Sequence, residues 1–216
     1  MSNRLKIVSI IPYKILPAKL GGEKGIALFN EYLSNEVDLT GITTKNNDPS
    51  LARGYKLLNI LSNSRSRYIN IFLYFRIRKI LNREQATCLI IEHPYYGWLA
   101  WMLRKTMNIR LVVHSHNIEY MRSKSIGRKW WKALKWYERW VYRFADKVFF
   151  ISEDDKDFAT RELGIDPTKS MAVTYGIEQE SIPPDLNESR KEIERLHHID
   201  PIEKILLFNG ALYHST

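Results

Sequence analysis

The sequence predicts an α/β protein with a Rossmann-like, mostly parallel sheet and helices on both faces. Short runs of β-branched and other apolar residues alternate along the chain with longer stretches of helical periodicity. Strands that alternate with helices form parallel sheets, and such sheets are buried on both faces. The first apolar run is followed by glycines and then by a helical pattern, which is the order in which a βαβ unit begins.

The elements follow from these patterns in chain order. The strands are expected at residues 5–11, 37–43, 55–61, 87–91, 110–114, 147–151 and 171–174. The helices are expected at residues 23–34, 68–81, 98–107, 128–145 and 154–163, with one short further helix at 188–196. The spacing of apolar residues fixes each of these ranges.

A change of composition predicts the domain organisation. Residues 1–182 are expected to form the Rossmann-like domain, and the charged, proline-bounded stretch 183–203 is expected to be a linker that carries the short helix. Residues 204–210 have the character of another opening strand and its turn, which assigns 204–216 to the start of a second domain. We therefore expect the sequence to be a piece of a longer protein.

Composition excludes several classes of protein. With 44% hydrophobic and 26% charged residues, the 216-residue chain is typical of a soluble globular protein. The single cysteine, Cys88, allows no internal disulfide and no thiolate zinc site, which favours a reduced cytosolic compartment. No apolar run approaches the ~18–20 residues of a transmembrane helix. The run Ile7–Ile11 is too short for a signal peptide, so any membrane contact is expected to be peripheral.

The positive charge is concentrated in one segment. The chain has 33 basic and 24 acidic residues, a formal charge of +9, which suggests a nucleic acid, an anionic membrane or an acidic substrate as a partner. Residues 101–143 alone carry 11 basic and 2 acidic residues. All six tryptophans lie in or beside this segment, at positions 98, 101, 130, 131, 136 and 140.

The helix expected at 128–145 combines these charges with aromatic residues. One face carries a cationic stripe made of Lys132, Lys135, Arg139 and Arg143. The opposite, apolar face is expected to cover the sheet and contains Trp130, Ala133, Leu134, Tyr137, Trp140, Val141 and Phe144. Trp131 and Trp136 lie off that face beside cations, which is typical of a helix at a lipid headgroup interface. A merely solvated stripe is the alternative.

The loop after the first strand contains Gly21, Gly22 and Gly25. Glycines between a strand and a helix let backbone amides approach a phosphate, and the helix N-terminus favours negative charge. The spacing is not that of a dinucleotide site, and the second strand ends in Thr43-Thr44-Lys45 without the acid that would hold a ribose. A P-loop is absent from the sequence. The glycines are interpreted either as a phosphate contact or as residues that serve only the turn.

Polar residues follow the strand expected at 110–114. His114, His116, Asn117 and Glu119 come at its carboxyl end, where ligands bind in open α/β sheets, and His93 follows the preceding strand. Two histidines separated by one residue could chelate a metal, but no third ligand is suitably spaced. Histidines bonded within their own loops are the alternative interpretation.

In several segments the sequence resembles family 4 glycosyltransferases of the GT-B fold. The matching segments are the first strand with Gly21-Gly22, the stretch Val112–Glu119, the strand end Phe149–Ser152, Tyr175-Gly176-Ile177 and the strand start Ile205–Gly210. The resemblance covers nearly the whole chain. It implies that the fold is the N-terminal, acceptor-binding half of a GT-B enzyme, whose second domain binds the nucleotide sugar.

The resemblance also implies roles for residues. Amides of Gly21 and Gly22 are expected to hold the donor diphosphate, and His116 to lie at the reacting centre. His114 ranks second, and the remaining residues expected to lie on the acceptor side or in the cleft are His93, Asn117, Glu119 and Arg122. No metal or other cofactor is expected. Tyr175 stands where the family usually has Asn, and the paired glutamates of the donor domain are missing, so the fragment alone is expected to be inactive.

The expected function is the acceptor-binding domain of a retaining hexosyltransferase-type enzyme. The partners would be a nucleotide diphosphate sugar and a glycan or lipid-linked acceptor at the cytoplasmic membrane face, as in polysaccharide or lipopolysaccharide biosynthesis. One alternative is a basic module that binds nucleic acid through aromatic stacking and phosphate contacts, which salt-dependent oligonucleotide binding would reveal. The other alternative is a non-catalytic α/β protein that binds a sugar or nucleotide.

Overall fold

The computed structural model describes residues 4–176 and 185–206. The chain divides into two compact units after Gly176, and each is described by itself. The strand expected at 204–210 lies, from residue 207 on, outside the described residues.

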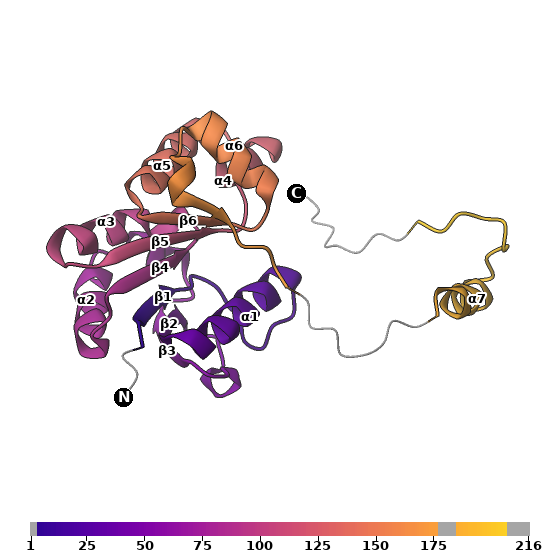
Figure 1. Ribbon diagram of the computed structural model, residues 1–216, viewed down its shortest axis with the longest axis horizontal. Helices are drawn as coiled ribbons and strands as arrows, with labels where there is room; N and C mark the ends of the chain where they lie inside the picture. Colours follow the sequence, from indigo (N-terminus) through magenta and orange to yellow (C-terminus); the bar gives the residue numbers. More distant parts are fainter. Residues whose placement is uncertain (1–3, 177–184, 207–216) are drawn as a thin grey trace. The chain divides into compact units, whose positions relative to one another are not determined.

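A seven-stranded sheet forms the centre of the first unit, in the order β3-β2-β1-β4-β5-β6-β7 (Figure 1). The strands are β1 (Lys6–Ile10), β2 (Asp38–Thr44), β3 (Lys56–Leu61), β4 (Cys88–Glu92), β5 (Arg110–Ser115), β6 (Lys147–Phe150) and β7 (Ser170–Ala172). All six strand pairings are parallel, which confirms the expected Rossmann-like sheet.

The helices of this unit connect the strands. They are α1 (Gly21–Glu36), α2 (Leu73–Glu84), α3 (Gly97–Thr106), α4 (Glu119–Ser125), α5 (Trp131–Phe144) and α6 (Glu153–Leu163). Short 3-10 turns are η1 (Pro49–Leu51), η2 (Arg65–Ile69), η3 (Pro94–Tyr96) and η4 (Pro167–Lys169).

Two helical expectations differ from the structure. The helix expected from residue 68 begins at Leu73, because the η2 turn, capped by the Ser64 side chain, takes up the preceding residues. The short helix α4 was not predicted, since its seven residues carry no extended apolar periodicity.

The two faces of the sheet are covered differently. Because side chains alternate along a strand, Val8 and Ile10 face one side and Ile7 faces the other. The first side packs against α2, α3, α5 and α6 in the large core cluster, represented by Ile77, Leu99 and Val141. On the second side, residues Phe29 and Leu33 of α1 lie against a smaller cluster (Figure 1). Both faces thus carry helices, as expected. Among the described helices, only α1 packs on the face toward which Glu92 and His114 of the candidate site point.

The second unit contains the helix α7 (Leu186–His197), which confirms the helix expected at 188–196. The Asp185 side chain caps it by accepting the Asn187 N–H at 2.8 Å. Arg190 pairs with Glu194 one turn later, with 2.6 Å between Nε and Oε1. Among the described residues of the chain, no helix is both long and apolar enough to cross a membrane.

Candidate functional site

The carboxyl ends of β4 and β5 bring Glu92 next to two histidines. Glu92 lies opposite His114 in the strand register, and both side chains are fully buried. Glu92 Oε2 is 2.6 Å from His116 Nε2 and 3.0 Å from His114 Nδ1. Burial raises the pKa of Glu92, but the two imidazoles outweigh it and hold the pKa at about 2. A buried carboxylate therefore organises the predicted pair His114 and His116.

His116 has a partner on each ring nitrogen. Because the ionised Glu92 only accepts hydrogen bonds, His116 Nε2 carries the proton, and Nδ1 is left to accept the Tyr175 O–H. Burial is the main cause that lowers the pKa of His116 to about 4, although Glu92 opposes it. The imidazole is therefore neutral near pH 7, with a tautomer set by Glu92.

A second buried carboxylate, Glu119, lies beside the first group. Its Oε1 accepts Asn117 Nδ2–H at 2.8 Å and lies 3.0 Å from His93 Nδ1, and its Oε2 accepts the Tyr95 O–H at 2.6 Å. Burial raises the pKa of Glu119, but these partners, led by His93, lower it to about 2. The sequence had placed His93, Asn117 and Glu119 in one crevice, and the structure brings them together.

The backbone of His93 takes a conformation that favours glycine. Its φ is +66° with ψ at 161°, a region that costs an L-residue energy and that clusters at functional sites. The conformation turns the chain from β4 into η3, and it brings the His93 ring 4.5 Å from the His116 ring, measured between centroids. Backbone strain is thus located at this site.

Glu138, a residue of α5, fixes the backbone at the start of α4. Its carboxylate accepts the backbone N–H groups of Glu119 and Tyr120 at 2.9 and 3.0 Å, and the Tyr142 O–H at 2.8 Å. The side chain is fully buried. Burial is the main cause that raises the pKa of Glu138 to about 7, against the three hydrogen bonds, which lower it.

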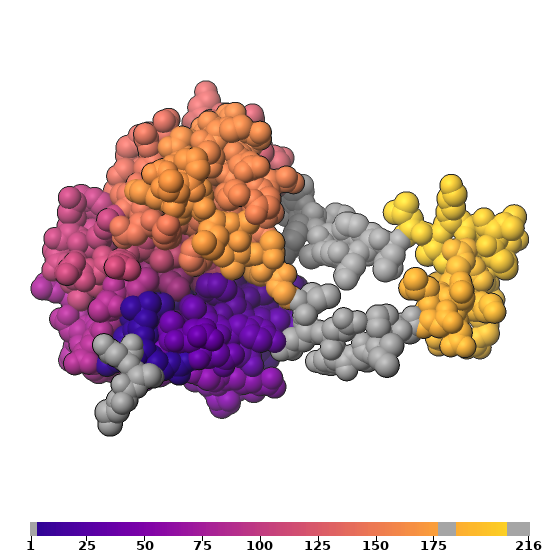
Figure 2. Space-filling view, in the orientation of Figure 1, coloured from indigo at the N-terminus to yellow at the C-terminus, as the bar shows by residue number. Residues whose placement is uncertain are grey.

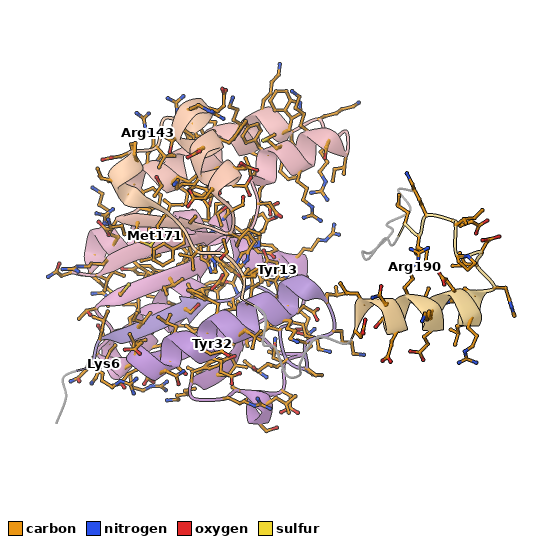
Figure 3. All side chains as sticks on the ribbon, turned by 45° about the vertical axis from the view of Figure 1, so that its right-hand side comes forward. Lys6, Tyr13, Tyr32, Arg143, Met171 and Arg190 are labelled. Carbon is orange, nitrogen blue, oxygen red and sulfur yellow. The ribbon has the colours of Figure 1, made fainter. Side chains whose placement is uncertain are left out.

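His93, His116 and Glu119 border a cavity of about 270 Å³, here called the polar cavity. It is lined by Tyr13, Gly22, Ile26, His93, Tyr95, His116, Asn117, Glu119, Arg122, Ile151 and Tyr175. Figure 3 shows the labelled Tyr13 next to the end of α1, among side chains that point toward the ends of the strands. Arg122 is its exposed cation, with Nη1 3.9 Å from Glu119 Oε2.

A second cavity of about 260 Å³ shares the lining residue Tyr175 with the polar cavity. It is lined mainly by apolar residues of α1 and by residues 173–176, and His114 contributes to it as well. The Tyr175 ring rests on Gly25, where an added Cβ would be 2.6 Å from the ring. Figure 2 shows this last stretch of the first unit, in orange, lying directly against α1, in purple. One tyrosine therefore lines both a polar and an apolar cavity.

The glycines at the start of α1 have different surroundings. Gly21 and Gly22 are the first two residues of the helix, and a Cβ at either position would meet nothing within 4 Å. Neither has a positive φ. Packing and backbone conformation thus give no reason for glycine here, whereas room for a ligand at the helix N-terminus would. Gly25, in contrast, is needed for packing against Tyr175.

Asn47 holds the loop that leads to these glycines. Its Oδ1 accepts the backbone N–H groups of Ile15 and Leu16 at 2.7 and 2.9 Å, and its Nδ2 donates to the Tyr13 carbonyl at 3.0 Å. The side chain is buried. The loop is therefore fixed by a side chain of the turn that follows β2.

Glu92, His114 and His116 are also the residues that could hold a metal ion. One potential ligand atom from each lies within 4.8 Å of the others. The sequence had offered no third ligand, and Glu92 supplies one. However, the shared Glu92 oxygen already accepts the His116 N–H, and that histidine's other nitrogen faces Tyr175. A metal would have to break this hydrogen bond, so the donor set fits a hydrogen-bonded cluster better than a metal centre.

The predicted cationic stripe on α5 is partly packed. Trp131 stacks on Tyr120 with 6.4 Å between ring centroids, and Lys135 Nζ lies 5.1 Å above the Tyr120 ring. Trp136 is exposed, as are Lys132, Arg139 and Arg143. Figure 3 shows the labelled Arg143 near the outer end of α5.

The expected inward face of α5 is only partly right. Leu134 and Val141 are buried, and Tyr137, Trp140 and Phe144 pack at the rim of the core. Trp130 and Ala133 are exposed, because α5 begins at Trp131 and Glu138 occupies the centre of the buried face.

Sequence reasoning missed four site residues: Glu92, Tyr13, Tyr95 and Glu138. A signal existed for two of them. Glu92 continues the alternation Cys88, Ile90 into the carboxyl end of β4, and Glu138 lies within the apolar stripe between Leu134 and Val141. Tyr13 comes from a loop and Tyr95 from the three-residue turn η3, for which no periodicity applies.

Comparison with known proteins identifies the family and the fold. Residues 21–181 match the profile of Glycosyltransferase Family 4, and the chain belongs to that family. Its fold is that of the N-terminal domain of GT-B glycosyltransferases. A search of the curated proteins gives no match.

Solved structures share this fold at low sequence identity. Sucrose-phosphate synthase from Thermosynechococcus elongatus is similar with a TM-score of 0.68 and 13% identity, over 88% of this chain and 53% of that one. A glycosyltransferase from Rickettsia africae has a TM-score of 0.60 and 14% identity, over 93% and 51%. Anabaena HepE in complex with UDP-glucose has a TM-score of 0.60 and 13% identity, over 91% and 50%. The chain thus spans about half the length of these structures.

Proposed function

We propose that the chain is the acceptor-binding domain of a retaining glycosyltransferase that uses a nucleotide diphosphate sugar. The observation that supports this most is the polar cavity, which is lined both by the neutral His116 and by Gly22 at the N-terminus of α1. The similar HepE structure contains UDP-glucose, which favours a donor of this class. The donor would be held between this domain and a second one.

The proposed roles of Gly21, Gly22 and His116 follow from their chemistry. The free amides of Gly21 and Gly22, with the helix dipole, would take up the charge that develops on the leaving diphosphate. Because a helix terminus can do this, the proposed reaction uses no metal and no other cofactor. His116 is the proposed catalytic residue and would contact the transferred sugar through Nδ1, once the Tyr175 hydroxyl leaves that nitrogen.

The acceptor would lie in the polar cavity. Aromatic rings at Tyr13 and Tyr95 offer surfaces on which a sugar ring can stack, and Glu119 and Arg122 offer an acceptor and a donor of hydrogen bonds. The proposed acceptor is a glycan or a lipid-linked sugar at the cytoplasmic membrane face. The exposed residues Trp136, Lys132, Arg139 and Arg143 of α5 would face that surface.

The test uses the protein encoded by the complete reading frame. Nucleotide sugars with different bases are screened for thermal stabilisation, and those that bind are assayed for transfer of labelled sugar to lipid and glycan extracts. We expect stabilisation by one donor, loss of transfer by at least ~10²-fold in His116→Ala, and little change in His198→Ala, an exposed histidine of the second unit. Failure of every nucleotide sugar to bind would refute the proposal.

A further inference from the structure

Four of the five most exposed large apolar side chains of the first unit gather at the start of α2. Ile69, Ile71, Phe72 and Phe75 expose 80%, 62%, 70% and 66% of their surface, and they are here called the α2 patch. Single exposed apolar residues are ordinary on protein surfaces, but four large ones within seven positions form a contiguous patch. Such a patch marks an interaction site.

The fold does not need this patch. Helix α2 already buries one apolar stripe against the sheet, which includes Leu73, Ile77 and Leu81. Phe72 and Phe75 lie off that stripe and contribute nothing to the core. Their apolar surface therefore remains available to a partner.

The charged side chains of the chain segment that carries the α2 patch are all positive. Residues 49–83 contain eight basic and no acidic residues. Of these, Arg65, Arg76 and Lys79 are exposed next to the patch. The nearest acid, Glu84, lies at the opposite end of α2, where it pairs with Lys56 and Arg83. Apolar and aromatic side chains set among unopposed cations suit the interface of an anionic phospholipid bilayer.

The patch is connected to the polar cavity. The Tyr68 ring, next to Ile69, lies 5.4 Å from the Tyr95 ring, measured between centroids, and the Tyr68 carbonyl accepts the Trp98 indole N–H at 2.8 Å. Tyr95 lines the cavity and donates to Glu119. A membrane that takes up the patch would lie close to the cavity mouth.

We propose that the α2 patch docks the protein on anionic membrane. Phe72 and Phe75 enter the boundary between headgroups and acyl chains, and Arg65, Arg76 and Lys79 contact lipid phosphates. This surface is distinct from the α5 stripe. The inference deepens the proposed function by naming the element that brings a lipid-linked acceptor to the cavity, but its test needs no nucleotide sugar and no transfer.

The experiment measures co-sedimentation of the protein with vesicles of phosphatidylcholine alone or with 30% phosphatidylglycerol. We expect binding to the anionic vesicles, and a loss of at least tenfold in the partition coefficient in Phe72→Ser/Phe75→Ser and in Arg76→Glu/Lys79→Glu. The matched control is Met171→Ser, which removes an exposed apolar side chain from β7. Trp136→Ser separates the contribution of α5. Circular dichroism shows that each variant is folded.

A second measurement does not depend on loss of function. An environment-sensitive fluorophore on Ile71→Cys should shift to the blue with anionic vesicles and not with neutral ones. Unchanged vesicle binding of the Phe72/Phe75 variant, or no fluorophore shift, overturns the proposal. It is also overturned if that variant turns a dimer into a monomer while vesicle binding persists, since the patch would then join two copies of the chain. Failure of the native protein to bind any nucleotide sugar would refute only the proposed function, and not the docking of the α2 patch.

Discussion

The Glu138 carboxylate accepts the backbone N–H of Glu119 at 2.9 Å, which ties the first residue of α4 to the buried side of α5. This contact couples stability to pH, because burial raises the pKa of Glu138 from 4.5 to about 7. Between these values the folded state binds more protons than the unfolded state, so the free energy of unfolding falls as pH rises from about 4.5 to about 7.

The Glu138→Gln variant lacks this titrating group. We therefore expect the gap between its unfolding free energy and that of the native protein to change by about 2–3 kcal/mol between pH 4.5 and pH 7. Urea denaturation at half-unit pH steps measures it. Glu36→Gln, at an exposed position on α1, serves as the control and should leave the profile unchanged. A constant offset between the Glu138 variant and the native protein at every pH would contradict the prediction.

Gly25→Ala should destabilise the protein by about 1–3 kcal/mol, because the new Cβ would be 2.6 Å from the Tyr175 ring, which has to move. Gly21→Ala is the matched control on the same helix. Its Cβ meets nothing within 4 Å, so thermal unfolding should stay within about 0.5 kcal/mol of the native value. In the complete protein we expect the same Gly21 variant to weaken donor binding. Equal stability of the two variants would count against the packing role of Gly25.

Asn47→Ala should cost about 2–4 kcal/mol, because it removes the acceptor for two backbone N–H groups, those of Ile15 and Leu16, in the loop before α1. Hydrogen exchange of both amides should accelerate more than that of the β1 core. Asn108→Ala, at an exposed loop position, is the control and should change stability by less than about 0.5 kcal/mol. Unaltered protection of the two amides in the Asn47 variant would show that the loop has another support.

Removal of metal should leave the protein unchanged. Since Glu92 already accepts the His116 N–H, we expect no stoichiometric zinc in the purified protein and the same thermal midpoint with and without EDTA. His114→Ala removes the other histidine that lies next to Glu92. The thermal midpoint of this variant should also be the same with and without EDTA. A chelator-dependent fall in the midpoint of the native protein, absent in this variant, would establish a metal centre instead.

The sequence predicted the parallel sheet well because strand and helix periods are local. The residues at which helices and strands begin and end depend on side chains that are not part of the periodic apolar pattern. The Ser64 cap delays α2, and the buried Glu138 supports the start of α4, which has little apolar pattern of its own. A local cap in one case and a tertiary contact in the other thus decide where these helices begin.

The candidate site was predictable where it depends on topology. His93, His116 and Glu119 meet because carboxyl ends of adjacent parallel strands share one edge of the sheet. The protonation pattern was not predictable, since it depends on Glu92 lying opposite His114 in the register and on Tyr175 arriving from the far end of the unit. Such long-range pairings carry no signal in a single sequence.

Tyr175 lines two cavities, of about 260 and 270 Å³. Since its ring borders both, we expect a glycine in its place to leave room for a ligand larger than either cavity holds. The protein is thus suited to a bump-and-hole design, in which an analogue with added bulk fits the widened variant and is excluded from native relatives. Under the proposed function, such a pair would label the products of this one protein among the other glycans of a cell.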